Sequence, residues 1–146
     1  MKNSRLHLVL TITVILFIFS GASANAAQRG ACSVLTLAEV RAIAGAPVVV
    51  LAAASDQPMV TDEMTLSNCM YTLPSGPGRV VHVQLMWAPK VNLEQIAKFT
   101  GKQNQALTSI KGDVLVLASV TGMKDNVRTF DRAASQQLLT ALLNKL

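Results

Sequence analysis

The sequence predicts an α+β domain, an antiparallel sheet of about four to five strands with two or three helices packed on one face. Three observations indicate this class. Segments with apolar residues at helical spacing occur early, in the middle and at the end of the chain. Alternating apolar runs typical of strands lie between them. Two of these runs flank PSGPG at 74–78, whose prolines and glycines predict the tight turn of a hairpin.

Residues 1–26 have the pattern of a cleaved export signal. Two basic residues precede an apolar run over 6–19, and small residues follow it. We expect cleavage after Ala26, with cleavage after Ala24 as the alternative. The apolar run, about 14 residues, is shorter than the roughly 20 residues that span a bilayer. We therefore expect a periplasmic or secreted protein, residues 27–146, that forms a single domain with no stable membrane span after signal cleavage.

The composition after the signal argues against a nucleic-acid partner. This part of the chain has 11 basic and 8 acidic residues, so its formal net charge is +3. The basic residues are spread without a cluster, and only four aromatic residues accompany them. Nucleic-acid surfaces need a concentrated basic face, usually with aromatic stacking partners. A charge of this size is explained by solubility alone.

Two cysteines, Cys32 and Cys69, remain after the signal. In an oxidising exported compartment an even pair usually forms a disulfide. The loop closed here would be about 38 residues, for which the chain-entropy model gives roughly 4 kcal/mol. Two buried free thiols are one alternative. A lipid anchor on Cys32 is another, which Gly30 and Ala31 fit but Arg29 does not.

The first helix is expected over residues 36–44. Thr36 and Glu39 have the spacing of a capping box, in which each satisfies a backbone amide of the other. Gly45 supplies the C-terminal stop. A strand is expected to follow over 48–53, because this apolar run is rich in β-branched residues.

The central hairpin is expected to join strands at 64–73 and 79–87. Alternation divides the second strand into two faces. The expected core face is Val81, Val83, Leu85 and Trp87, and the other face is Val80, His82, Gln84 and Met86. In the first strand, Cys69, Tyr71 and Leu73 share one face. A disulfide would therefore tie this strand to the start of the first helix.

The second half of the chain repeats this order of elements. A helix is expected over 92–101, with Asn92 as its cap and Gly101 at its end. A buried strand is expected over 113–121. Residues 106–110 are a candidate partner strand for it, across the turn that separates them.

The chain is expected to end in an amphipathic helix. Asp131 is a favourable N-cap residue. Apolar residues then recur at helical spacing and form one stripe: Ala134, Leu138, Leu139, Leu142, Leu143 and Leu146. Lys145 near the C-terminus suits the helix dipole.

Two motifs resemble those of a broad, largely uncharacterised group of small exported bacterial proteins and lipoproteins. The segment ACSVLTLAEVRAIAGAPV contains the pattern Cys-x-x-Leu-Thr-x-x-Glu-Val at a helix start, and SNCMYTLP contains Cys-x-Tyr in a strand. The resemblance covers most of 31–146, but NQALTSIKG stands where similar proteins often carry a Gly-Leu-Gly-Asp-Glu-Ala-type segment. It implies an exported α+β domain tied by a disulfide, and it implies no catalysis.

A hydrolase is one alternative function, with His82 as base and an acidic residue as its partner. His82 is the single histidine after the signal, but no G-x-S-x-G motif accompanies it. Asp62 and Glu63 are adjacent in a loop, which does not provide two carboxylates across a cleft. We therefore predict no catalytic residues.

Copper binding is a second alternative, because thioether and imidazole ligands select Cu(I). Met59, Met64, Met70 and Met86 lie near Cys69 and His82 in the sequence. Their spacing is irregular, and methionine is also an ordinary core residue. We therefore predict no metal site and no cofactor.

The preferred interpretation is a small exported binding or interaction domain. The sheet face without helices is its expected contact surface, with His82, Gln84, Met86 and Tyr71 as candidate binding residues. The partner is a protein, an envelope component or a small molecule.

Overall fold

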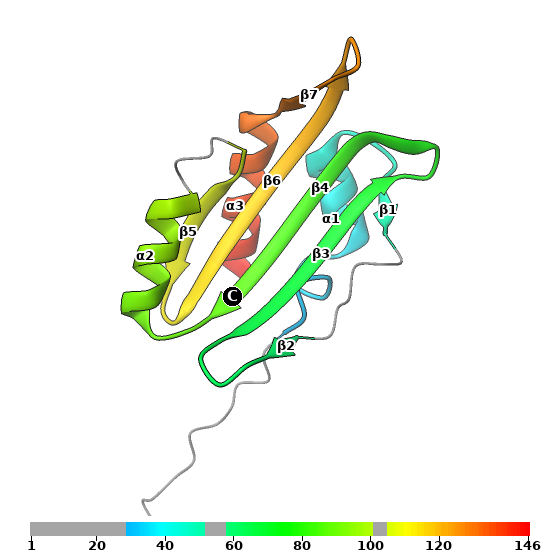
Figure 1. The fold of residues 1–146 in the computed structure, drawn as a ribbon. Coiled ribbons are helices and arrows are strands. Elements are labelled where there is room, and N and C mark those ends of the chain that lie inside the picture. The colour runs from blue at the N-terminus through cyan, green and yellow to red at the C-terminus, as the bar shows by residue number, and fades with distance from the viewer. Residues whose placement is uncertain (1–28, 52–57, 101–104) are drawn as a thin grey trace, which may run out of the picture.

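The structure is a computed structural model that describes residues 29–51, 58–100 and 105–146 (Figure 1). It confirms the α+β class, since three helices accompany an antiparallel sheet within these ranges. The sheet has seven strands there, where four to five were predicted. The helices are α1 (Leu37–Ala44), α2 (Lys90–Thr100) and α3 (Arg132–Lys145). The strands are β1 (Val49–Val50), β2 (Met59–Val60), β3 (Thr65–Leu73), β4 (Gly76–Trp87), β5 (Leu107–Lys111), β6 (Val114–Lys124) and β7 (Val127–Phe130).

Three predictions fall wholly or partly outside these ranges. They are the signal over residues 1–26, the end of the strand over 48–53, and the helix stop at Gly101. In its described part the predicted strand is shorter than expected, because β1 includes Val49 and Val50 but neither Val48 nor Leu51.

The sheet is organised around the long strands β3, β4 and β6. Its strand order is β1-β3-β4-β6-β5, with β2 also paired to β3 and β7 also paired to β6. The predicted hairpin is confirmed, because β3 and β4 pair along their length. The predicted start of its second strand at residue 79 is wrong, because β4 begins at Gly76 and only Pro74 and Ser75 lie between the strands. The candidate partner strand is β5, which pairs with β6 across a turn containing Gly112. The φ angle of Gly112 is 62°, a conformation that favours glycine.

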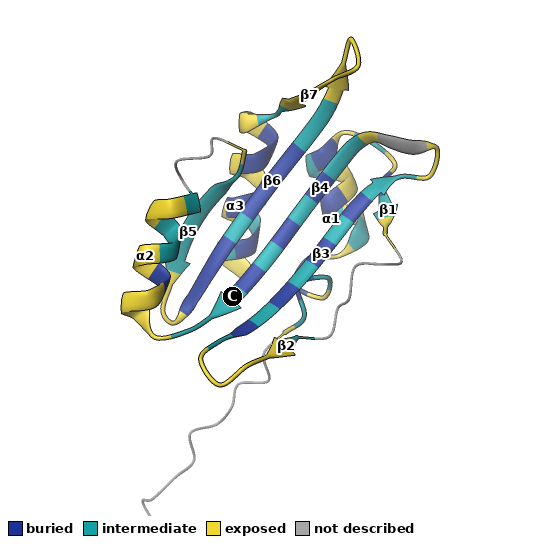
Figure 2. Cartoon of the chain, viewed as in Figure 1, coloured by how far each residue is buried: buried dark blue, intermediate teal, exposed yellow. Residues whose placement is uncertain are grey.

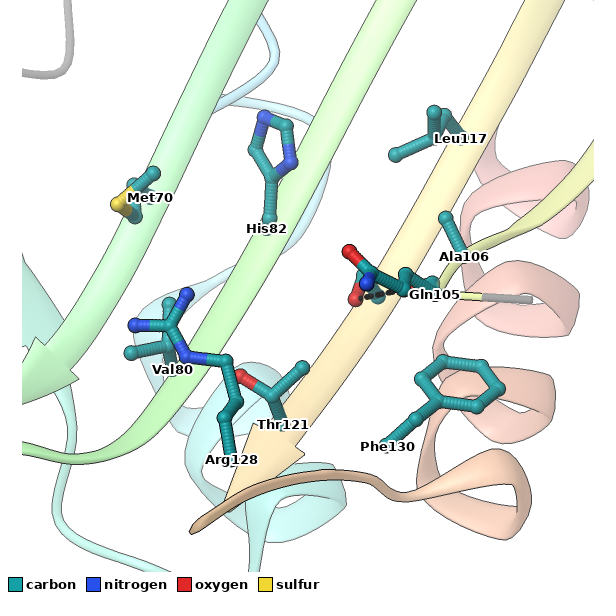
Figure 3. A pocket seen from close by; sticks show the side chains of 10 residues that line it. Met70, Val80, His82, Gln105, Ala106, Leu117, Thr121, Arg128 and Phe130 are labelled. Carbon is teal, nitrogen blue, oxygen red and sulfur yellow. Dashed lines mark hydrogen bonds between the residues drawn. The ribbon is translucent and has the colours of Figure 1, made fainter. Parts of the chain in front are cut away.

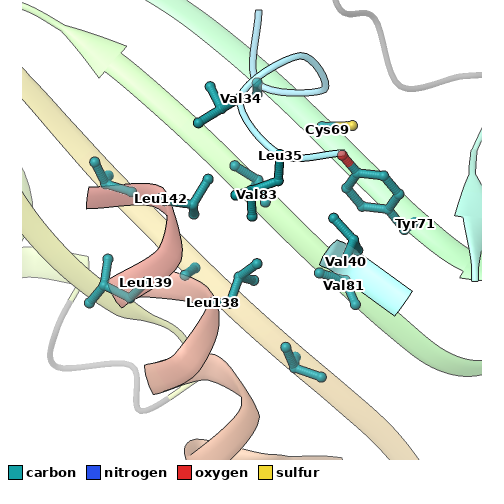
Figure 4. Close-up of a cluster of buried hydrophobic side chains, with 14 of the residues drawn as sticks. Val34, Leu35, Val40, Cys69, Tyr71, Val81, Val83, Leu138, Leu139 and Leu142 are labelled. Carbon is teal, nitrogen blue, oxygen red and sulfur yellow. The ribbon is translucent and has the colours of Figure 1, made fainter. Parts of the chain in front are cut away.

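The core lies between one face of the sheet and the helices α1 and α3 (Figures 2 and 4). The predicted core side of β4 is confirmed: Val81, Val83 and Leu85 are buried, and Trp87 is partly buried against them. The predicted stripe of α3 packs on the same face, with Ala134, Leu138, Leu139 and Leu142 buried and Leu143 and Leu146 partly buried. Burying a Val or Leu side chain fully contributes roughly 1.5–3 kcal/mol, so this layer is the main source of stability.

The helix ends follow the predicted local rules. The Thr36 hydroxyl accepts a hydrogen bond from the Glu39 amide at 3.3 Å, and Glu39 Oε2 accepts one from the Thr36 amide at 2.8 Å. The predicted capping box is therefore confirmed, as is Gly45, whose φ is 64°. Lys145 Nζ lies 3.1 Å from Glu39 Oε1, so an exposed ion pair joins α3 to α1.

The predicted start of α2 at Asn92 is wrong, because the helix begins at Lys90. The amides of Asn92 and Leu93 both donate to the carbonyl oxygen of Pro89, at 2.9 and 3.2 Å. The first turn therefore forms at Pro89, and Asn92 lies inside it.

Helix α2 covers one end of the opposite sheet face. Leu93 on α2 is fully buried, yet it lies outside the main core, as does Leu115 on β6. Leu115 lies between Val114 and Val116 on β6, and both of these belong to the core. Because side chains alternate along a strand, Leu115 points to the opposite face. Helix α2 packs against β5 and β6, and this packing explains why Leu93 and Leu115 are buried on that face.

The predicted disulfide between Cys32 and Cys69 is present, with a sequence separation of 37 residues. It holds the segment before α1 against the middle of β3. The Ala31 amide donates to the Ser67 hydroxyl at 2.8 Å and reinforces the same junction. Both thiols are consumed by this bond, so the two free thiols considered above are not present.

The start of α3 fills a break along one edge of β6. There β5 pairs with residues 114–118 and β7 with residues 121–124, which leaves Ser119 and Val120 between them. The Val120 amide instead donates to the Ser135 hydroxyl, and the Val120 carbonyl accepts from the Asp131 amide, both at 2.8 Å. The edge of the sheet thus consists of two short strands joined through the first turn of α3.

Candidate functional site

The candidate site is a hollow of about 370 Å³ on the sheet face opposite α1 and α3 (Figure 3). Its floor consists of side chains from β3, β4 and β6, and its walls come from β7 and the residues just before β5. We call it the hollow, lined by Met70, Val80, His82, Gln105, Ala106, Leu117, Ser119, Thr121, Arg128 and Phe130.

Strand register brings the floor residues together. Met70 pairs with His82, and His82 pairs with Ser119. Directly paired residues in antiparallel strands have side chains on the same face, so these three form a row across the sheet. Val80 and Thr121 form the adjacent pair on this face. The floor is therefore fixed by backbone pairing of three long strands, and its geometry does not depend on a loop.

The walls come from the two elements on either side of the break in the edge of β6. The Ser119 hydroxyl donates to the carbonyl oxygen of Gln105 at 2.7 Å, which holds the approach to β5 against the floor (Figure 3). On the other side, Phe130 pairs with Thr121. Arg128 lies two residues before Phe130, so both side chains project to the hollow side of β7.

The predicted binding residues are only partly brought together. His82 lines the hollow, as its face in the alternation indicated. Gln84 and Met86 share that face of β4 but lie further along the strand and do not line the hollow. The placement of Tyr71 with them is wrong, because Tyr71 is 1% exposed and belongs to the core on the opposite face.

Sequence reasoning missed the residues supplied by β6 and β7. Ser119, Arg128 and Phe130 come near His82 only through pairing between distant strands. The sequence signal that could have located these residues is the pair Asp125-Asn126, which forms the turn between β6 and β7 with φ angles of 52° and 62°. Asp and Asn are common where a two-residue hairpin turn needs positive φ.

Two basic side chains, His82 and Arg128, line the hollow, and none of the lining residues that the structure describes is acidic. Burial lowers the pKa of the His82 imidazole below its ordinary value of 6.5, since a charged ring would lose hydration there. His82 is therefore neutral at pH 7. The guanidinium of Arg128 then carries the formal charge among these residues.

The hollow does not have the composition of a hydrolase site. A catalytic histidine needs a carboxylate to orient it and a nucleophile to act on. Among the described residues that line the hollow none is acidic, and the neighbouring Ser119 hydroxyl is engaged with the Gln105 carbonyl. Asp62 and Glu63 line a separate depression beside Trp87, about 16 Å along β4 from His82 at the usual rise per residue.

The residues considered for copper are also dispersed. Met70 and His82 are neighbours in the hollow, whereas Met64 lies in the depression beside Trp87. Met59 is on β2, where it is 60% exposed. Cys69 is in the disulfide and unavailable as a thiolate ligand. Within the described ranges, no three His, Cys, Asp or Glu residues are grouped as metal ligands would be.

Comparison with known proteins does not assign a function to the hollow. No family model, curated protein or solved structure matches this chain. Among the helices that the structure describes, none combines the length and apolar character needed to cross a membrane. The function is therefore argued from the geometry and chemistry of the site.

Proposed function

We propose that this protein is a small exported, periplasmic or secreted, binding module that holds its ligand in the hollow and performs no catalysis. The observation that carries this proposal is the hollow itself. It combines apolar side chains with a few polar groups on a floor built from paired strands. The N-terminal signal pattern and the disulfide support export.

The size and lining of the hollow fit a small ligand or one anchoring group of a larger partner. Its volume of about 370 Å³ lies at the lower end of the range for ligand pockets, about 300–1,000 Å³. Met70, Leu117 and Phe130 offer apolar contact, while His82 and Thr121 offer hydrogen-bonding groups. Such a mixture is typical of binding sites, in which apolar area supplies affinity and a few polar groups supply orientation.

The test is a fragment screen by NMR on the exported protein produced from the full-length gene, with its methionine methyl groups labelled. We expect a subset of fragments to shift the Met70 methyl and His82 ring signals while leaving Met59 unchanged. Met59 serves as an internal control, because it is exposed on β2 and lies outside the hollow.

A pair of matched variants checks the location. Ala106→Trp places an indole at the rim of the hollow and should abolish the fragment shifts. Ala133→Trp makes the same change on the exposed surface of α3 and should leave them intact. Shifts that survive Ala106→Trp, or a screen with no response at Met70 and His82, would overturn the proposed function.

A further inference from the structure

Arg128 is an unpaired cation at the edge of the hollow. Within the part of the chain that the structure describes, ion pairs join Arg79 to Asp131 and Lys145 to Glu39, and no carboxylate faces Arg128. No protein hydrogen bond in these ranges engages its guanidinium. Figure 3 shows the Arg128 side chain reaching from β7 over the sheet toward Val80. Its five N–H donors are therefore free to meet an anion.

The other described residues that line the hollow neither neutralise the charge of Arg128 nor offer a second cation to the same anion. His82 is neutral at pH 7, and the Ser119 hydroxyl already donates to the Gln105 carbonyl. Other side chains that line the hollow are apolar, namely Met70, Val80, Leu117 and Phe130. A ligand that fits this arrangement has one anionic group and an apolar body.

We propose that the hollow binds a single-chain amphipathic anion, whose head group meets Arg128 and whose apolar part lies against Phe130 and Leu117. This inference rests on the proposed function and adds the chemical class of the ligand. Arginine is suited to the head group, because its planar fork binds carboxylate or phosphate oxygens in pairs. The volume of about 370 Å³ favours a small molecule with one chain over a two-chain lipid.

Three probes with the same chain and different charge test the class. Octanoate, octan-1-ol and octylammonium are titrated into the exported protein, with the Met70 methyl signal as readout. We expect octanoate to bind about two- to fivefold more tightly than octan-1-ol, and octylammonium to bind most weakly. The expected factor is modest because Arg128 is partly solvated, and solvated ion pairs contribute little.

Charge variants separate a specific contact from a general effect of net charge. Arg128→Gln should reduce octanoate affinity about two- to fivefold and leave octan-1-ol affinity unchanged. Arg132→Gln removes the same charge four residues away, on exposed α3 surface that does not line the hollow, and should have no effect. Because Arg128 is exposed and has no protein partner, Arg128→Gln should fold normally, which circular dichroism checks.

The outcomes distinguish this inference from the proposed function. One outcome is that octan-1-ol binds at Met70 as tightly as octanoate and that Arg128→Gln does not change octanoate affinity. The proposed anionic ligand is then wrong, while the proposed binding function stands. If none of the three probes shifts Met70, this inference fails, and the fragment screen alone decides the proposed function. Arg128-dependent sedimentation with phosphatidylglycerol vesicles, without octanoate binding, would assign the contact to a bilayer headgroup and overturn the single-chain ligand.

Discussion

Ser135→Ala removes the side chain that joins the two halves of the sheet edge at Val120. The Ser135 hydroxyl is fully buried, accepts from the Val120 amide at 2.8 Å and donates to the Asp131 carbonyl at 2.7 Å. Alanine cannot replace either bond. The Val120 amide is itself buried and would be left without a partner, which costs about 1–3 kcal/mol.

We expect the free energy of unfolding to fall by about 2–3 kcal/mol, because the orphaned amide and the second lost bond both contribute. The assay is urea unfolding of the oxidised protein, followed by circular dichroism and by the fluorescence of Trp87. With a slope of about 1.5 kcal/mol per molar urea, the midpoint should fall by roughly 1.5–2 M. The Val120 amide should also exchange its hydrogen faster than its neighbours on β6.

Thr140→Ala is the matched control on the same helix. The Thr140 hydroxyl is exposed and bonds only to the Gln136 carbonyl one turn earlier, so its loss should change stability by less than about 0.5 kcal/mol. If Ser135→Ala is as mild as this control, or if exchange at Val120 is unchanged, the proposed bridging role of Ser135 is refuted.

Three further predictions concern stability. Arg79→Met should lower the free energy of unfolding, measured with urea, by about 1–3 kcal/mol, because it removes the 2.7 Å ion pair with Asp131 at a half-buried junction. A smaller loss of stability from Asp131→Asn than from Asp131→Ala would show that Asp131 also contributes as the N-cap of α3. Cys32→Ala with Cys69→Ala should lower stability by about 2–4 kcal/mol, and an unchanged midpoint would contradict this. Burial lowers the pKa of His82 in the folded protein, so on acidification the unfolded chain binds a proton at a higher pH than the folded chain does. The free energy of unfolding should therefore fall as the pH drops below 6.5. NMR titration of the His82 ring should give a midpoint below 6.5, and a higher midpoint would refute its burial.

The elements with strong local signals could be predicted from the sequence. The capping box at Thr36, the cap at Asp131 and the hairpin turn after β3 are each set by a few adjacent residues, and each is found in the structure, with the turn confined to Pro74 and Ser75. Alternation along β4 identified its core face, because a strand with one buried face repeats every two residues.

Elements that depend on distant pairing could not be predicted in the same way. Strand β7 is four residues long and almost entirely exposed, so it shows no alternation to detect. Its position follows from pairing with β6, and the wall at Arg128 follows from that position. His82 could be assigned to the correct face from its own strand, but the residues that make a hollow around it come from two other parts of the chain.

The misplacement of Tyr71 has a different cause. Tyr71 is two residues from Cys69 on the same strand, so the two side chains share a face. Since the disulfide draws the α1 side of the molecule onto that face, the pairing of Cys32 with Cys69 already implied that Tyr71 is covered.

The break between β5 and β7 also affects how copies of this chain meet one another. A long, straight strand with unpaired backbone groups can template a strand from another molecule and start aggregation. Here the outer edge offers only the five residues of β5 and the four of β7, separated by helical backbone that cannot extend a ladder. This interruption therefore limits the length over which strands of two chains can pair at this edge.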